Sequence, residues 1–400
     1  MSPSALVRPR PVHRAADLLA AYLPGSFYYS SAHGSLLADG VHATVRAGHG
    51  ARAHAAAEAL DAAAVAGVAE PVVAGAIGFR PDAETSLVVP AVVRRAGGPS
   101  TAGHVPGPAF GGMKWSIDPK PEPEGYAEGV RRALALIDDG ELRKVVLARC
   151  LELTADAPVP VPSLLAGLVR ANPTAHAFAV DVSAPGDRAP RTLVGASPEL
   201  LVSRDGAEVV ANPLAGSLPR VSDEAENQRR IAALLASEKD RVEHGHVSAQ
   251  VAEVLGRFCV DLDVPAEPVV IGTPTMWHLS TRISGRLADA ADPGSSALAL
   301  AEALHPTPAV CGVPAARARA TIADLEPEDR GYYSGLVGWT DLEGDGEWVV
   351  TIRSAEVSDR TVRLFAGAGI VAGSDPAAEL AETSAKFRTM LRVLGLGTAA

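Results

Sequence analysis

Apolar residues recur along the chain in two spacings that predict different elements. Continuous or alternating runs of β-branched residues indicate strands, and apolar residues three or four positions apart indicate one helix face. Strands come in runs and helices in runs, which favours an α+β class of antiparallel sheets packed with helices. Predicted strands are 72–79, 85–93, 144–153, 177–182, 191–195, 200–204, 209–211, 334–340, 348–354 and 361–366, and predicted helices are 15–22, 51–64, 126–138, 223–258, 295–304 and 377–394.

One segment, 97–125, is too rich in glycine and proline to hold a helix or a central strand. We expect it to be a loop or connector at the end of an N-terminal part, residues 1–124, ahead of the rest of the chain. A length of 400 residues allows two or three domains, or one large elaborated domain.

Composition narrows the class of function. The chain carries 36 basic and 47 acidic side chains, a net charge of −11, and only 4% aromatic residues. This excludes a basic, base-stacking nucleic-acid surface and disfavours a surface that collects anions. Three widely separated cysteines fit a reducing cytoplasm, and no apolar stretch has the length of a signal peptide core or a membrane span.

Two predicted helices carry paired carboxylates. Asp240 and Glu243 stand three residues apart on one helix, and Glu379 and Glu382 do so on the last helix. Side chains at this spacing share a helix face, and a set of carboxylates without cysteine suits a hard cation such as Mg²⁺. Such pairs are also common on solvated helix faces, and spacing alone does not show that the two helices meet.

A glycine-rich segment, 365–373, lies between a predicted strand and the last helix. It begins like a dinucleotide-binding loop, but the chain ends before the second strand that such a site needs. We therefore exclude a nicotinamide cofactor and expect a tight turn whose N–H groups can hold a carboxylate.

Several polar residues stand beside apolar runs. Lys144 opens a strand, Glu199 follows a Gly-Ala-Ser-Pro segment, and Arg353 follows another apolar run. Each can equally point into solvent, although the planar guanidinium of Arg353 suits a carboxylate. His278 is more often a structural histidine than a base, and Tyr333 is as suited to packing as to ligand contact.

Taken together, the ordered segments resemble the chorismate-utilising enzyme family, which includes anthranilate synthase component I, aminodeoxychorismate synthase, isochorismate synthase and salicylate synthase. The resemblance covers about 125–396 and implies one domain over 1–400, with 125–396 as the catalytic core. It implies two large antiparallel sheets packed as a sandwich, helices outside, and an active site in a cleft between them. The segments are KVVLAR (144–149), GASPELLVS (195–203), NPLAGSLPR (212–220), SEKDRVEH (237–244), WHLSTRISG (277–285), HPTPAVCGVP (305–314), RGYYSGLVGW (330–339), TIRSAEV (351–357) and GAGIVAGSDPAAELAETSAK (367–386).

The resemblance also implies a metal site. Members of the family hold one Mg²⁺ between two acidic helices, where it binds the ring carboxylate of the substrate. By this match Glu243 and Glu382 are direct ligands, with Asp240 and Glu379 in support.

Substrate contacts follow from the same match. Arg353 and Tyr333 resemble the residues that grip the enolpyruvyl carboxylate, and His278 matches a histidine near the reacting face of the ring. The backbone of Gly367, Ala368 and Gly369, together with Lys386, is similar to further carboxylate and metal-site contacts.

The branch of the family is indicated by its nucleophile. Lys144 stands where anthranilate synthases lack a lysine, and it is the implied base that activates water. Aminodeoxychorismate synthases carry a nucleophilic lysine within the segment that here reads Ala215, Gly216 and Ser217, so that covalent route is closed. Water activated by Lys144 leaves isochorismate synthase or salicylate synthase.

Ala309 favours isochorismate synthase, because salicylate synthases tend to carry threonine there. We expect an isomerase that adds water at C2 of chorismate while Glu199 protonates the departing C4 hydroxyl. The alternatives are salicylate synthase, an isochorismate synthase of the menaquinone rather than the siderophore pathway, and a non-catalytic acidic metal-binding scaffold. We expect chorismate and isochorismate as the only partners, a monomer, and no glutamine amidotransferase subunit.

Overall fold

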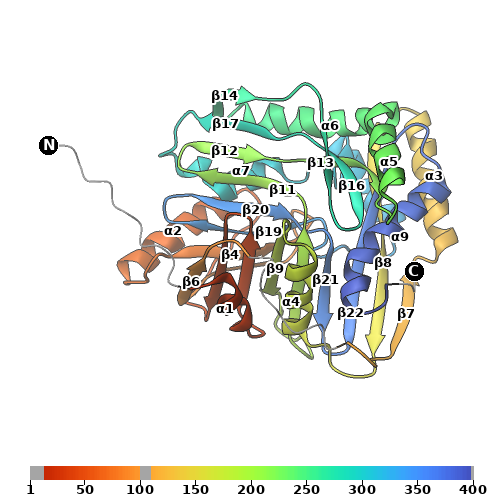
Figure 1. The fold of residues 1–400 in the computed structure, drawn as a ribbon. Helices are drawn as coiled ribbons and strands as arrows, with labels where there is room; N and C mark the ends of the chain where they lie inside the picture. Colours follow the sequence, from red (N-terminus) through yellow and green to blue (C-terminus); the bar gives the residue numbers. More distant parts are fainter. Residues whose placement is uncertain (1–12, 100–109, 398–400) are drawn as a thin grey trace.

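Most strands belong to two large sheets in the computed structural model, which describes residues 13–99 and 110–397 (Figure 1). The first sheet has the order β18-β8-β22-β21-β10-β9-β1-β2-β6, with β7 also paired to β8. Its strands are β1 (Phe27–Ser31), β2 (Gly34–Asp39), β6 (Val92–Ala96), β7 (Trp115–Lys120), β8 (Lys144–Ala155), β9 (His176–Asp181), β10 (Arg191–Ser197), β18 (Gly312–Val313), β21 (Ser354–Ser358) and β22 (Thr361–Ile370).

The second sheet has the order β14-β17-β12-β11-β20-β19-β4-β5-β3, and a small third sheet has the order β13-β16-β15. The second sheet contains β3 (Ala43–Thr44), β4 (Val72–Ile77), β5 (Thr85–Val89), β11 (Leu200–Asp205), β12 (Glu208–Ala211), β14 (Cys259–Asp263), β17 (Ile283–Leu287), β19 (Leu336–Asp341) and β20 (Gly346–Val350). The third contains β13 (Leu214–Pro219), β15 (Val269–Gly272) and β16 (Met276–Ser280).

Helices cover these sheets. They are α1 (Ala15–Ala20), α2 (Arg52–Val65), α3 (Pro123–Asp138), α4 (Val161–Ala171), α5 (Glu224–Ala236), α6 (Glu238–Leu255), α7 (Ala297–Leu304), α8 (Ala315–Leu325) and α9 (Pro376–Val393), with a 3₁₀ turn at Pro293–Ser295. α9 packs on β22 and α3, and α6 packs on β13 and β16. Figure 1 shows α9 beside β22 and β8 at the right. None of the helices in the described ranges is long and apolar enough to cross a membrane.

The two large sheets pack face to face, which confirms the predicted α+β sandwich. One buried cluster joins Tyr29 and Phe178 of the first sheet to Ala74 and Val337 of the second. Each of the two large sheets takes strands from both the N-terminal part and the core of the chain. The single domain over 1–400 stays a prediction.

Two crossovers carry the chain between these sheets at neighbouring positions. Pro198 and Glu199 join β10 to β11, and residues 351–353 join β20 to β21. The backbone N–H of Val350 donates to the Glu199 carbonyl (3.2 Å), and that of Ala196 donates to the Arg353 carbonyl (3.1 Å). The predicted strand 348–354 is therefore two strands, and its break places Arg353 next to Glu199.

Three further local predictions are wrong. The long helix 223–258 is two helices, because Ser237 adopts an extended conformation (φ −70°, ψ 111°) and accepts the N–H of Asp240 as the N-cap of α6. The expected turn at Gly367–Gly369 is the end of β22, fully paired with β8. In the predicted connector, 115–120 is the edge strand β7 and α3 begins at Pro123, while 100–109 lies outside the described residues. Proline is tolerated in β7 because the strand is an edge.

The N-cap of α6 yields a stability prediction. Ser237→Ala removes the acceptor for the Asp240 N–H, and we expect a loss of about 1 kcal/mol in the free energy of unfolding. Ser248→Ala, in the middle of the same helix, is the control and should change it by less than about 0.5 kcal/mol. Urea unfolding followed by circular dichroism measures both. Equal effects of the two changes would contradict the assigned cap.

Candidate active site

One small cavity, of about 60 Å³, gathers most of the residues that the sequence predicted. It lies where β8 and β22 meet the third sheet, α6, α9 and the two crossovers. The predicted residues that line this small cavity are Glu199, Ala215, Gly216, Ser217, Glu243, His278, Ala309, Tyr333, Arg353, Gly367, Gly369, Glu382 and Lys386.

Four predicted residues do not line the small cavity. Lys144 is fully buried behind Glu243, and Glu379 is buried at the start of α9. Asp240 is one turn before Glu243 on α6, where its Cβ lies 3.0 Å from the position that a Cβ on Gly216 would take. Ala368 is fully buried within β22 between the two lining glycines.

Glu199 is a buried acid at a sheet crossover. Burial raises the pKa of its carboxyl to about 7, although the Leu214 N–H and the positive charges of Lys144, Lys386 and Arg353 favour the ionised form. A carboxyl with a pKa near 7 is protonated in a large fraction of molecules at neutral pH and can donate a proton.

Lys144 begins β8, and its Nζ lies 3.0 Å from Glu243 Oε1 without forming a well-aligned hydrogen bond. Gly369 makes room for this pair: a Cβ there would stand 2.0 Å from Glu243 Oε1 and 3.1 Å from Lys144 Cε. A glycine at this position in the strand is therefore required by the close approach of the two side chains.

Arg353 contributes a positive charge to the lining of the small cavity. Burial lowers the pKa of its guanidinium to about 10, so that it remains a cation at neutral pH. Its Nη2 lies 3.4 Å from Nε2 of His278, whose pKa is lowered well below its ordinary value by burial and by Arg353. A neutral His278 can accept this hydrogen bond.

Tyr333 completes this part of the lining as a neutral phenol. Its ring stacks on Phe365 with centroids 5.3 Å apart, and burial raises the pKa of its hydroxyl. A protonated hydroxyl beside a guanidinium is a suitable donor set for a carboxylate.

The acidic side chains of α9 are paired with lysines. Lys239 Nζ contacts Glu379 Oε1 and Lys386 Nζ contacts Glu382 Oε1, both at 2.6 Å. Ser217 donates to Glu382 at 3.0 Å. Burial raises the pKa of Glu379 and so does the charge of Glu382; burial acts on Glu382 as well, but Lys386 and Ser217 hold its pKa below the ordinary value.

These acidic groups provide ligands of the right chemistry for a hard cation. Across 13–99 and 110–397 no three Asp, Glu, His or Cys side chains come close enough to enclose a metal ion. However, Glu243 and Glu382 line the small cavity from two different helices, and Asp240 lies close enough to both that their charges raise its pKa, after the larger effect of burial. Carboxylate oxygens from two helices fit Mg²⁺ with water or substrate as its remaining ligands.

The sequence did not identify the apolar part of the lining or one of the lysines. Val146, Leu214, Val310 and Ile352 form walls of the small cavity, but apolar residues carry no chemical signature in a sequence. Lys239 stands beside Asp240 in the segment 237–244, and only its ion pair with Glu379 across α6 and α9 identifies its partner.

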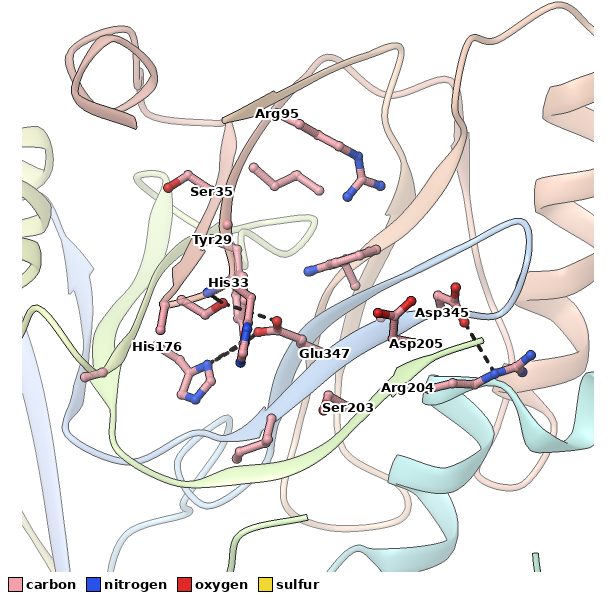
Figure 2. A pocket seen from close by; sticks show the side chains of 18 of the residues that line it. Tyr29, His33, Ser35, Arg95, His176, Ser203, Arg204, Asp205, Asp345 and Glu347 are labelled. Atoms are coloured by element: carbon pink, nitrogen blue, oxygen red, sulfur yellow. Dashed lines mark hydrogen bonds and ion pairs between the residues drawn. The ribbon is translucent and has the colours of Figure 1, made fainter. Parts of the chain in front are cut away.

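A larger cavity, of about 1540 Å³, opens elsewhere between the sheets (Figure 2). At its base, Tyr29 donates to Glu347 at 3.0 Å, and His176 Nδ1 lies 3.6 Å from the same carboxylate. Of the predicted site residues, Arg353 alone lines this cavity, which also shares Pro198 with the small one. We assign the chemistry to the small cavity because the acid, the cations and the paired carboxylates meet there.

The fold and this constellation define a chorismate-binding enzyme, and comparisons with known proteins agree. The model of the family described as chorismate binding enzyme matches residues 109–395, and the chain belongs to this family. The resemblance deduced from the sequence is confirmed.

The chain is similar to individual isochorismate synthases. It is 50% identical to isochorismate synthase DhbC of Bacillus subtilis (strain 168), over 96% of this chain and 97% of that protein. It is 40% identical to the vibriobactin-specific isochorismate synthase of Vibrio cholerae, over 92% of this chain and 91% of that protein. The crystal structure of a putative 2,3-dihydroxybenzoate-specific isochorismate synthase, DhbC from Bacillus anthracis, matches with a TM-score of 0.91 and 43% identity, covering 96% of this chain and all of that chain.

The close approach at Gly369 yields a prediction. Gly369→Ala places a methyl group on the Glu243 carboxylate, and we expect a loss of about 1–3 kcal/mol in the free energy of unfolding. Gly245→Ala, on α6 with open space around it, is the control and should be neutral or stabilise by up to about 1 kcal/mol. Urea unfolding measures both. Unchanged stability of Gly369→Ala would show that Glu243 and Lys144 do not approach the strand as described.

Proposed function

We propose that this protein is an isochorismate synthase, which converts chorismate reversibly into isochorismate. The observation that carries the proposal is the buried Glu199, with a pKa of about 7, in a cavity that also holds the cations needed for a dianionic substrate. The similarity over nearly the whole chain to named isochorismate synthases supports it and disfavours a non-catalytic scaffold.

Two residues carry the proton transfers. In the reactive form Lys144 is a neutral amine, and it accepts a proton from water as the water oxygen bonds to C2 of the ring. Both ring double bonds shift, from C1=C2 and C5=C6 to C1=C6 and C4=C5, the C4–O bond breaks, and Glu199 donates its proton so that the hydroxyl leaves as water. One turnover therefore leaves Lys144 protonated and Glu199 ionised, and exchange with solvent restores both. Each positioned group of this kind contributes about 10²–10⁴-fold to the rate.

The cationic residues bind and orient the substrate. Arg353 and Tyr333 take the enolpyruvyl carboxylate, through a guanidinium and a protonated hydroxyl held by stacking on Phe365. The neutral His278 holds Arg353 in place without adding charge. The backbone of Gly367 and the ammonium of Lys386, which are themselves joined at 2.8 Å, lie beside the ring carboxylate.

We propose Mg²⁺ as the cofactor, held directly by Glu243 and Glu382 and supported by Asp240 and Glu379. When bound, it offsets the charge of the ring carboxylate and fixes the ring between acid and base. The all-carboxylate donor set from α6 and α9 supports this assignment.

The small Ala309 in the lining favours isochorismate as the final product over further elimination of pyruvate by a salicylate synthase. Relatives named for 2,3-dihydroxybenzoate and vibriobactin favour a siderophore pathway over a menaquinone pathway.

We also propose a cytoplasmic monomer without a glutamine amidotransferase subunit. The three cysteines are buried and unpaired, as suits a reducing compartment, and the proposed nucleophile is water rather than ammonia.

Product analysis tests the proposal. Incubation with chorismate and Mg²⁺, followed by chromatography, should yield isochorismate without pyruvate or salicylate, and chelation of the metal should stop turnover. Pyruvate with fluorescent salicylate would identify a salicylate synthase instead, and no consumption of chorismate would favour the scaffold.

Lys144→Ala should lower kcat by about 10²–10⁴-fold, because water then lacks its base. Circular dichroism provides the check on folding, since the change also leaves Glu243 without its partner. A folded variant that forms isochorismate at a nearly normal rate would contradict the assigned base.

The pH dependence tests Glu199. Only the protonated carboxyl can donate to the leaving group, so a group with a pKa of about 7 in the free enzyme predicts that kcat/KM falls as pH rises through this value. Glu199→Gln cannot donate a proton and should lose activity by about 10²–10⁴-fold together with that descending limb. The same pH profile in the glutamine variant would assign the limb to another group.

A further inference from the structure

A buried ion pair lies just outside the small cavity. Glu326 caps the C-terminus of α8, and Arg330 follows four residues later in the loop, with side chains only 6% and 2% exposed. The guanidinium makes two contacts to the carboxylate, Nη2 to Oε1 at 2.6 Å and Nε to Oε2 at 2.8 Å. Neither residue lines the small cavity.

This pair fills a gap in the first sheet. On one edge of β8, β18 pairs with residues 144–145 and β7 pairs with residues 150–155, and neither strand reaches the residues between. There the Ala148 N–H donates to Glu326 (2.8 Å), and Arg330 donates to the Val146 carbonyl (2.8 Å). The two side chains thus satisfy backbone groups that a neighbouring strand would otherwise pair.

Arg330 also connects β8 to two other parts of the lining. Its Nη1 donates to the Val310 carbonyl at 2.7 Å, and its backbone carbonyl accepts the Tyr333 N–H at 2.8 Å. Its guanidinium lies over the rings of Phe79 (4.5 Å) and Tyr333 (5.8 Å). Val146, Val310 and Tyr333 all line the small cavity, so one side chain ties together three of its walls.

Stability alone does not explain a pair of this kind. Burying two charges carries a desolvation cost, and apolar replacements of buried ion pairs are often neutral or stabilising. The planar guanidinium instead supplies several donors in a rigid arrangement that no apolar side chain can copy.

We propose that Arg330 and Glu326 are positioning residues for substrate binding. The two residues hold Val146, Val310 and Tyr333 at the spacing that fits the enolpyruvyl end of chorismate. This proposal rests on the proposed function. That end is attached to C3 through an ether oxygen, and none of its bonds changes while the hydroxyl moves from C4 to C2. Loosening the walls should therefore weaken binding of substrate and transition state alike, which raises KM and leaves kcat nearly unchanged.

Arg330→Lys keeps the charge but loses the fork of donors. We expect KM for chorismate to rise about tenfold, the effect of losing one charged hydrogen bond, while kcat stays within about threefold. The matched control is Arg257→Lys, which alters an exposed ion pair of the same i, i+4 spacing and should change neither constant.

A double variant separates positioning from stability. Arg330→Met with Glu326→Gln leaves no unpaired buried charge, and the glutamine can still accept the Ala148 N–H, so the melting temperature should recover relative to Arg330→Met alone. The donors to Val146 and Val310 remain absent, so KM should stay raised. A wild-type KM in this double variant, or in folded Arg330→Lys, would overturn the inference.

The proposed function can fail independently of this inference. If the wild-type protein does not isomerise chorismate, the proposed function is overturned. Calorimetric binding of chorismate then compares the wild-type protein with Arg330→Lys without depending on turnover. A dissociation constant raised about tenfold in Arg330→Lys supports the positioning role, and an unchanged one overturns it.

Discussion

The structure depends on the point where the chain crosses twice between its two large sheets. The crossovers at 198–199 and 351–353 lie side by side because backbone hydrogen bonds join Val350 to Glu199 and Ala196 to Arg353. Strand pairing on both sides leaves little freedom at these positions, and Arg353 adopts a left-handed backbone (φ 52°) that the surrounding pairing maintains. The proposed proton donor and the proposed carboxylate-binding cation are thus held in register by the sandwich itself.

Burial decides the electrostatics around this point. A net charge of −11 made a site for anions look unfavourable, yet Lys144, Lys386 and Arg353 all act on Glu199 with positive charge. Their attraction lowers the pKa of Glu199, and the desolvation of a fully buried carboxyl outweighs it, leaving the pKa at about 7. Net charge describes the surface of the protein, whereas the local arrangement of cations and paired acids describes the site.

The site also requires glycine at two positions where side chains approach the backbone closely. Gly369 lies in a fully paired strand and leaves room for Glu243 against Lys144, and Gly216 (φ 76°) does the same for Asp240. Gly369 was predicted to lie in a turn, since glycine is the common turn residue. Glycine is needed at both positions because acidic side chains of α6 occupy the space that a Cβ would take. No local sequence pattern records this contact.

The family, the α+β class and most residues of the small cavity could be predicted from the amino-acid sequence, because each lies in a recognisable segment beside a periodic strand or helix. The pairing of Asp240 with Glu243 and of Glu379 with Glu382 could be predicted too, since helical spacing is a local property. The contact of Lys239 on α6 with Glu379 on α9, and the completion of an edge of β8 by Arg330 and Glu326, became visible in the folded structure. These contacts join residues far apart in the chain or replace missing strand pairing, and they follow from packing that no periodicity records.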